Sequence, residues 1–175
     1  MIEPARFLSL RGEAEYRDLG EVLLRTPGDA VLIRRGMPRS LLIACPDGCG
    51  ETLLINLDPR TTKAWRMDTR GGGVTLYPSV WRDGGCGSHF VVWRGRVIWC
   101  DRFELGNVEP PYDSSLETRL LEVLKADYLR SSEDLAAELD EITWEVSRAA
   151  RKLVKRGIVD QGVGNQRDWF RRKGI

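Results

Sequence analysis

The clearest fold signal in the chain is the segment Phe90-Val91-Val92-Trp93-Arg94-Gly95-Arg96-Val97-Ile98-Trp99. Its two runs of β-branched and aromatic residues are typical of strands, and they flank the dipeptide Arg94-Gly95. Glycine at such a turn accepts the positive φ that a tight hairpin requires. We therefore predict two antiparallel strands, 90–93 and 96–99, joined by a short turn.

Similar short apolar runs precede this hairpin and extend the β-rich pattern toward the N-terminus. Turn residues such as Pro27-Gly28-Asp29 and Gly71-Gly72-Gly73 separate these runs. The runs lie at residues 30–33, 40–43, 52–55 and 74–77. They predict a small, mostly antiparallel sheet or sandwich that occupies residues 1–104.

The pattern changes after a predicted linker at residues 105–112, which contains two consecutive prolines. Residues 113–175 show apolar stripes at helical spacing, and Ser114 with Glu117 predicts a capping box. Ser131 and Thr143 are the expected caps of a second and a third helix. A hairpin around residues 162–165 follows, so three helices and a wing indicate a winged helix-turn-helix. The predicted fold class is α+β.

A metal motif lies within the β-rich part. Cys45 and Cys49 form a Cys-x3-Cys pair, and after a gap of 36 residues Cys86 and His89 form a Cys-x2-His pair. Two ligand pairs on separate turns are a usual way to build a tetrahedral zinc site. We expect one structural Zn²⁺, because four protein ligands leave no position for an activated water.

Two alternatives to this ligand set stay open: Cys100 as a ligand, and Cys45 or Cys49 as a small core residue with His89 as a polar residue whose hydrogen bonds are satisfied. Cys100 can replace His89 as the fourth ligand, although a buried cysteine is its simpler interpretation. His89 is the only histidine of the chain, so a Ser/His/Asp triad would have to take His89 away from the metal. We find no zinc-deaminase, metalloprotease, G-x-S-x-G or phosphate-loop motif, so the sequence favours no catalytic residues and a protein that is not an enzyme.

The stretches Thr75-Leu76-Tyr77-Pro78-Ser79-Val80, Cys86-Gly87-Ser88-His89-Phe90 and Trp93-Arg94-Gly95-Arg96-Val97 resemble an uncharacterised family of small bacterial Cys/His proteins. Some members are encoded beside ubiquitin-like modifiers and their conjugating enzymes, in operons linked with defence against phage. The resemblance covers about residues 30–101 and implies the same four zinc ligands. It also implies protein partners, namely a ubiquitin-like modifier or its E1/E2-like enzymes.

Charge is uneven in the C-terminal part, although the whole chain has a net charge of only +1. Residues 113–147 carry 10 acidic and 3 basic side chains, whereas residues 148–175 carry 9 basic and 2 acidic ones. A basic third helix and wing are typical of contacts with DNA phosphates. The predicted nucleic-acid or partner-binding residues are Arg148, Arg151, Lys152, Lys155, Arg156, Arg167, Arg171 and Arg172.

Three functions follow as expectations. The first is a non-catalytic zinc-binding accessory protein that docks partners in a ubiquitin-like conjugation system. The second is a regulator that binds double-stranded DNA through the winged helix. The third is an enzyme with a hydrolytic or transfer role, such as a ligase-like factor that positions a conjugating enzyme without doing chemistry itself. The chain shows no apolar stretch of membrane-spanning length and no secretory signal, so we expect a cytoplasmic protein without a membrane partner.

Overall fold

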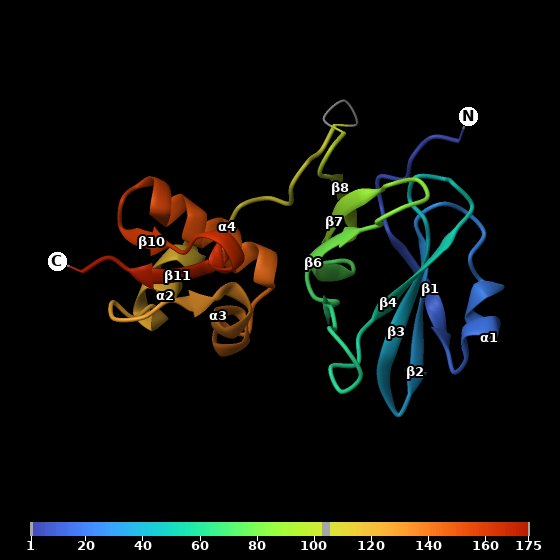
Figure 1. Cartoon of the computed structure of the whole chain (residues 1–175), viewed down its shortest axis with the longest axis horizontal. Helices are drawn as coiled ribbons and strands as arrows, with labels where there is room; N and C mark the ends of the chain where they lie inside the picture. The colour runs from blue at the N-terminus through green and yellow to red at the C-terminus, as the bar shows by residue number, and fades with distance from the viewer. Residues whose placement is uncertain (1, 103–105, 175) are drawn as a thin grey trace. The chain divides into compact units, whose positions relative to one another are not determined.

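The computed structural model describes residues 2–102 and 106–174, and Figure 1 shows their path. The chain divides into two compact units, Met1–Pro110 and Pro111–Ile175. Their boundary falls inside the predicted linker, whose first residue, Leu105, lies outside the described residues. The predicted boundaries at 104 and 113 stay a prediction.

The first unit contains two four-stranded sheets. One has the order β1-β2-β3-β4 and comprises β1 (Ser9–Ala14), β2 (Asp29–Arg35), β3 (Met37–Ala44) and β4 (Thr52–Asn56). The other has the order β5-β6-β7-β8 and comprises β5 (Arg66–Asp68), β6 (Thr75–Trp81), β7 (His89–Trp93) and β8 (Arg96–Trp99). Figure 1 shows the green strands β6–β8 beside the blue and teal strands of the first sheet.

The two sheets share one hydrophobic core. Leu41 and Ile43 from the first sheet pack in one cluster with Phe90, Val92 and Trp99 from the second. The predicted hairpin is confirmed, since Phe90 pairs with Trp99 and the turn residues Arg94 and Gly95 have φ values of 48° and 75°. The core therefore fixes β6 and β7, the strands that carry the candidate site, against the first sheet.

The first sheet departs from the antiparallel prediction at its N-terminal edge. β1 pairs parallel with β2, and helix α1 (Arg17–Glu21) connects them; the sequence indicated neither element. α1 is only five residues long, too short for a periodic apolar stripe to reveal it. Val31 and Ile33 of β2 pack with Leu23 and Leu24 after α1, so the central run 30–33 of β2 is buried on both faces and is apolar.

The second unit comprises three helices and a small sheet. Its helices are α2 (Ser115–Val123), α3 (Ser132–Leu139) and α4 (Thr143–Lys155). β9 (Arg130–Ser131), β10 (Val159–Gln161) and β11 (Trp169–Arg172) form an antiparallel sheet of order β10-β11-β9, with the short 3-10 helix η2 (Gly164–Gln166) between β10 and β11. Three helices and a C-terminal hairpin are present, and their assignment to the winged-helix class stays a prediction.

Helix caps agree with the sequence at only one of three places. Ser131 caps α3 as predicted, because its hydroxyl accepts from the Asp134 amide at 3.1 Å. Ser114 makes no side-chain cap, and Glu117 contacts the Tyr112 hydroxyl and Arg156 instead of reaching back. Thr143 is the first residue of α4 rather than its cap. Glu117 therefore contacts residues outside the first turn of α2 in place of the local capping bond.

Candidate functional site

Three of the four predicted metal ligands come together. The Sγ atoms of Cys45, Cys49 and Cys86 all lie within 4.8 Å of one another. Cys45 follows β3 directly, and the tight turn after it is closed by the Gly48 amide, which donates to the Cys45 carbonyl at 3.0 Å. Gly48 has a φ of 79°, a conformation that glycine adopts without strain. Cys86 lies in the glycine-rich turn before β7.

The surroundings of the thiols differ strongly. Burial raises the pKa of Cys45 to about 12. Burial also opposes ionisation of Cys86, but hydrogen bonds from the Ser88 side chain and backbone, together with the neighbouring thiols, lower the pKa of Cys86 to about 7. The Ser88 hydroxyl is 2.9 Å from the Cys86 sulfur. The buried Cys45 thiol does not ionise at neutral pH unless a cation compensates its charge.

The cluster therefore fits a thiophilic metal ion. All three cysteines are free of disulfides, and their donor atoms are soft and close together, as zinc requires. Bound metal would join the turn after β3 to the turn before β7, and this role needs no chemistry beyond coordination. The identity of the metal and its fourth ligand are taken up below as predictions.

His89 lies outside this cysteine group and has other contacts. Its Nε2 is 3.1 Å from the Ser79 hydroxyl oxygen, and its Nδ1 is 3.3 Å from the Asp101 carboxylate. His89 is the first residue of β7, where successive side chains point to opposite sides of the strand. The buried Ser88 side chain contacts the Cys45 and Cys86 sulfurs, so the next residue, His89, is directed away from them.

Ser79, His89 and Asp101 are positioned by β6, by β7 and by the segment after β8, respectively. Ser79 lies in β6 where the register with β7 shifts between Leu76 and Val80, an irregularity of the kind that often re-aims a side chain. The indole Nε1 of Trp65 donates to the Ser79 carbonyl at 3.3 Å and holds this segment. Asp101 follows β8, and the Cys100 amide donates to the His89 carbonyl at 2.9 Å.

The histidine is partly shielded from water. Trp81 is the residue opposite His89 on the neighbouring strand, and its ring centroid lies 5.9 Å from that of the imidazole. The His89 side chain is 29% exposed, whereas the Asp101 side chain is 72% exposed. A shielded base beside a hydroxyl and an accessible carboxylate gives the order Ser, His, Asp that a serine hydrolase uses.

Cys100 lies outside the group of three thiols. It is half-buried, and burial raises its pKa. A half-buried thiol outside the cysteine group agrees with the simpler of the two interpretations that the sequence allowed.

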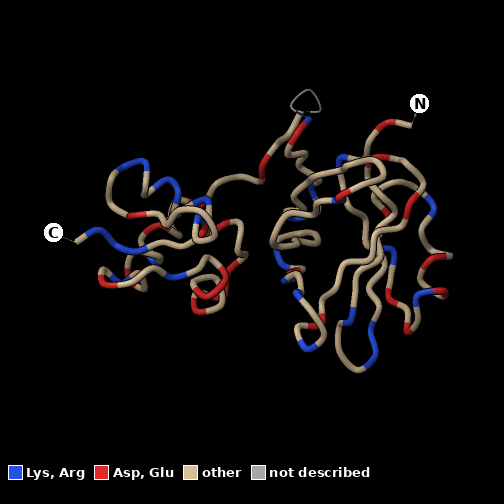
Figure 2. The backbone as a smooth tube through the Cα atoms, in the orientation of Figure 1, with Lys and Arg blue, Asp and Glu red and all other residues tan. Residues whose placement is uncertain are grey.

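The predicted basic residues of the second unit are largely engaged within that unit. Arg148 pairs with Glu145 at 2.7 Å, Arg151 pairs with Asp168, and Arg156 pairs with Glu117. Lys152 lies over the Tyr112 ring at 4.5 Å, and Arg171 pairs with Asp160 at 3.2 Å. Lys155, Arg167 and Arg172 are exposed. Figure 2 shows Lys and Arg in blue along α4 and toward the C-terminus.

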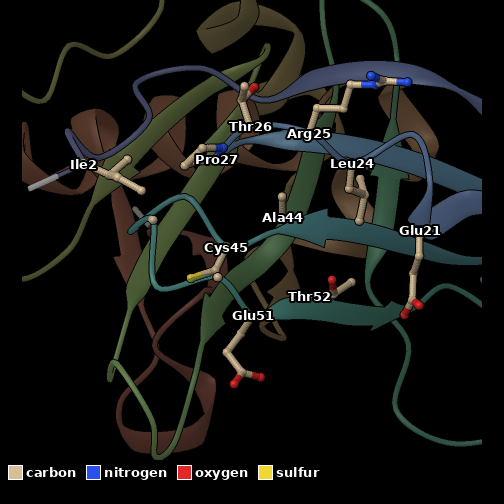
Figure 3. A pocket seen from close by; sticks show the side chains of 12 residues that line it. Ile2, Glu21, Leu24, Arg25, Thr26, Pro27, Ala44, Cys45, Glu51 and Thr52 are labelled. Carbon is tan, nitrogen blue, oxygen red and sulfur yellow. The ribbon is translucent and has the colours of Figure 1, made fainter.

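The first unit contains two hollows near the candidate site. Figure 3 shows one of about 240 Å³, lined by Glu21, Leu24, Cys45 and Thr52 among others, and no residue of the Ser79–His89–Asp101 set lines it. A second hollow of about 290 Å³ is lined by β4 together with Trp65, Val80, Trp81 and Arg82. Only the second hollow adjoins Ser79 along the chain.

Sequence reasoning missed Ser79 and Asp101 as functional residues. Ser79 lies in the stretch Thr75-Leu76-Tyr77-Pro78-Ser79-Val80, but no motif such as G-x-S-x-G distinguishes it from a structural serine. Asp101 is one of many unpatterned acidic residues. The one available signal was the single histidine, since any Ser/His/Asp arrangement in this chain must use His89.

Comparison with protein families gives a match over part of the chain. Residues 18–100 match the model described as "Bacterial ubiquitination-like system serine protease (BubE)". This stretch covers most of the residues over which the sequence resembles proteins encoded beside ubiquitin-like modifiers. Comparison with curated proteins and with solved structures gives no match. No helix among residues 2–102 and 106–174 is long and apolar enough to cross a membrane.

Proposed function

We propose that the chain is a serine hydrolase of a bacterial ubiquitin-like system and cleaves an amide bond in a protein substrate. Ser79 is the nucleophile, His89 the general base and Asp101 the residue that orients it. The observation that carries this proposal is the double contact of His89, with Ser79 at Nε2 and with Asp101 at Nδ1. The name of the matching family model, a serine protease, supports the same reaction class.

The chemistry follows from these contacts. Ser79 Oγ attacks the substrate carbonyl carbon while His89 Nε2 accepts the hydroxyl proton. Asp101 stabilises the positive charge that develops on the imidazole. The same Nε2 then protonates the leaving amine as the carbon–nitrogen bond breaks, which leaves an ester on Ser79. A water molecule, deprotonated by His89, hydrolyses that ester and restores the serine.

The cysteine cluster supports this site without taking part in the reaction. Cys86 and His89 are separated by only two residues, so a metal ion held by Cys45, Cys49 and Cys86 would anchor the turn that leads into β7. That anchoring fixes the position of the start of β7, and therefore of His89. The metal therefore has the structural role expected from the sequence, and the protein substrate takes the place of the expected docking partner.

The expected non-catalytic accessory role is a weaker account of the same residues. It explains the metal and the two units, but it leaves the contacts of Ser79, His89 and Asp101 without a purpose. DNA binding is also weakened, because Arg148, Arg151 and Arg156 are already paired with carboxylates. Lys155, Arg167 and Arg172 remain the basic surface on which either a DNA or a protein partner would rely.

Covalent labelling tests the proposal directly. A fluorophosphonate probe should modify the folded protein at Ser79, because the probe reacts with serines that an adjacent base activates. His89→Gln should slow labelling by about 100-fold or more, in the range assigned to a general base. Peptide mass spectrometry locates the modified serine. Equal labelling of the native and the heat-unfolded protein would contradict an activated serine.

Asp101→Asn should have a smaller effect than the same change in a buried triad. A buried triad aspartate is worth roughly 10⁴-fold in rate. Because the Asp101 side chain is 72% exposed, water and salt screen its charge, and we expect a loss of about 10- to 100-fold. The pH dependence of kcat/KM measures this loss. Asp83→Asn is the control, because Asp83 is an exposed acid in the turn between β6 and β7. An unchanged pH profile in Asp101→Asn would contradict the orienting role.

A further inference from the structure

The outer edge of β4 carries free backbone hydrogen-bonding groups. β4 is the last strand in the order β1-β2-β3-β4, so only one of its sides is paired. Leu57 donates to Arg39 and Glu51 accepts from Cys45 on the β3 side. By the alternation of an antiparallel pair, the amides and carbonyls of Thr52 and Leu54 point outward. Within the described part of the chain, no segment pairs with them.

This edge forms one wall of a hollow that leads toward Ser79. The hollow has a volume of about 290 Å³, and Val80, Trp81 and Arg82 form the facing wall. Trp65 lies between the walls, since its amide donates to the Asn56 carbonyl at 2.8 Å and its indole donates to the Ser79 carbonyl. The edge of β4 is thus tied through one side chain to the backbone of the proposed nucleophile.

Two apolar side chains border the same hollow and are exposed. Leu54 is 52% exposed and Trp81 is 67% exposed. Trp81 also packs against His89, so the apolar border continues to the proposed base. Open backbone groups with apolar side chains on either side are the features by which proteins bind an extended chain as an added strand.

We propose that the substrate binds as an extended peptide strand along the outer edge of β4, with an apolar side chain between Leu54 and Trp81. This rests on the proposed function, because the bound strand runs toward Ser79. An unfolded segment satisfies the outward groups of Thr52 and Leu54, which a helix or a folded surface does not. The specificity residues are then Leu54 and Trp81, and the cleaved bond lies in an extended segment of the substrate.

Backbone methylation of the substrate tests strand addition without altering the protein. The probe is a short internally quenched peptide that the wild-type protein cleaves, prepared with N-methyl groups at alternate amides in two registers. One register should raise KM by about tenfold per methyl group, since each removes a hydrogen bond and introduces a clash. The other register, whose amides point away from β4, should change KM less than twofold. Equal effects in both registers would overturn the proposal.

Leu54→Pro provides the matching change in the protein. Proline removes the outward amide of Leu54, and at an edge strand it leaves the bonds toward β3 in place. KM for the unmethylated peptide should rise about tenfold, whereas Leu54→Ala, which keeps the amide, should raise it less. Circular dichroism and the melting temperature verify the fold of both variants. A KM equal to that of the wild type in folded Leu54→Pro would overturn the proposal.

The failure of the catalytic proposal is distinguishable from the failure of this one. If Ser79 is neither labelled nor required for cleavage, the serine hydrolase is wrong. Strand addition can still be measured with Ser79→Ala. Tryptophan fluorescence then reports how tightly this variant binds the two series of methylated peptides. A register-dependent affinity supports the β4 edge as a peptide site, and register-independent affinity or no binding rejects it.

Discussion

Ser79→Ala is expected to reduce cleavage of a protein or peptide substrate by roughly 10⁴- to 10⁶-fold, the range found when a nucleophilic serine is removed from a triad. The physical reason is that alanine has no oxygen to form the acyl ester, and His89 then has no hydroxyl to deprotonate. Ser79 is partly buried and its carbonyl is held by Trp65, so loss of one hydroxyl should leave the fold intact.

The measurement is single-turnover cleavage of a quenched peptide, with a conjugate of the system's modifier as a second substrate. Ser40→Ala is the matched control, because Ser40 lies in β3 and pairs with Asn56, away from His89. It should retain the wild-type rate. Full activity in Ser79→Ala, with Ser40→Ala also active, would exclude Ser79 as the nucleophile.

Metal removal is expected to have the second largest effect. The wild-type protein should contain about one zinc ion per chain. Cys86→Ser should lose this zinc, because removal of one of the three close cysteine ligands greatly lowers the affinity for the metal. Since metal binding contributes folding free energy, the melting temperature of the first unit should fall on the order of 10 °C. Metal analysis and calorimetry provide the two readings.

Variants of His89 and Cys100 separate the two interpretations of the histidine. We expect His89→Gln to keep its zinc and lose hydrolysis, because His89 contacts Ser79 and Asp101 rather than the thiols. Cys100→Ser should keep both zinc and activity. If His89→Gln loses zinc, the ligand set predicted from the sequence is right and the triad is wrong. Absence of zinc from the wild type would end the metal hypothesis altogether.

Local patterns predicted β2–β4 and β6–β8 from their apolar runs, whereas β1 and β5 were missed. The hairpin of β7 and β8 depends on a glycine that accepts positive φ, and the core alternation of Phe90, Val92 and Trp99 follows from one strand. Capping was less predictable. The Ser131 hydroxyl accepts from a local amide, whereas the Glu117 carboxylate contacts Tyr112 and Arg156, which both lie outside the first turn of α2.

The candidate site was predictable in part. Cysteine is rare in this chain, so the spacing of Cys45, Cys49 and Cys86 carried information, and the structure brings these three together. The fourth position was assigned to His89 because Cys-x2-His has ligand spacing. Spacing does not specify the side of a strand, and His89 begins β7 directly after Ser88, whose side chain already occupies the side that faces the thiols.

The sequence by itself determined the β-rich first part, the helical second part, the cysteine cluster and the single histidine, because each depends on residue type and short spacing. Tertiary structure alone decided what that histidine contacts. Ser79, His89 and Asp101 come from β6, β7 and the segment after β8, and only strand pairing with a shifted register brings them together. It also left the edge of β4 open beside them, since a free edge depends on which strand comes last in the sheet.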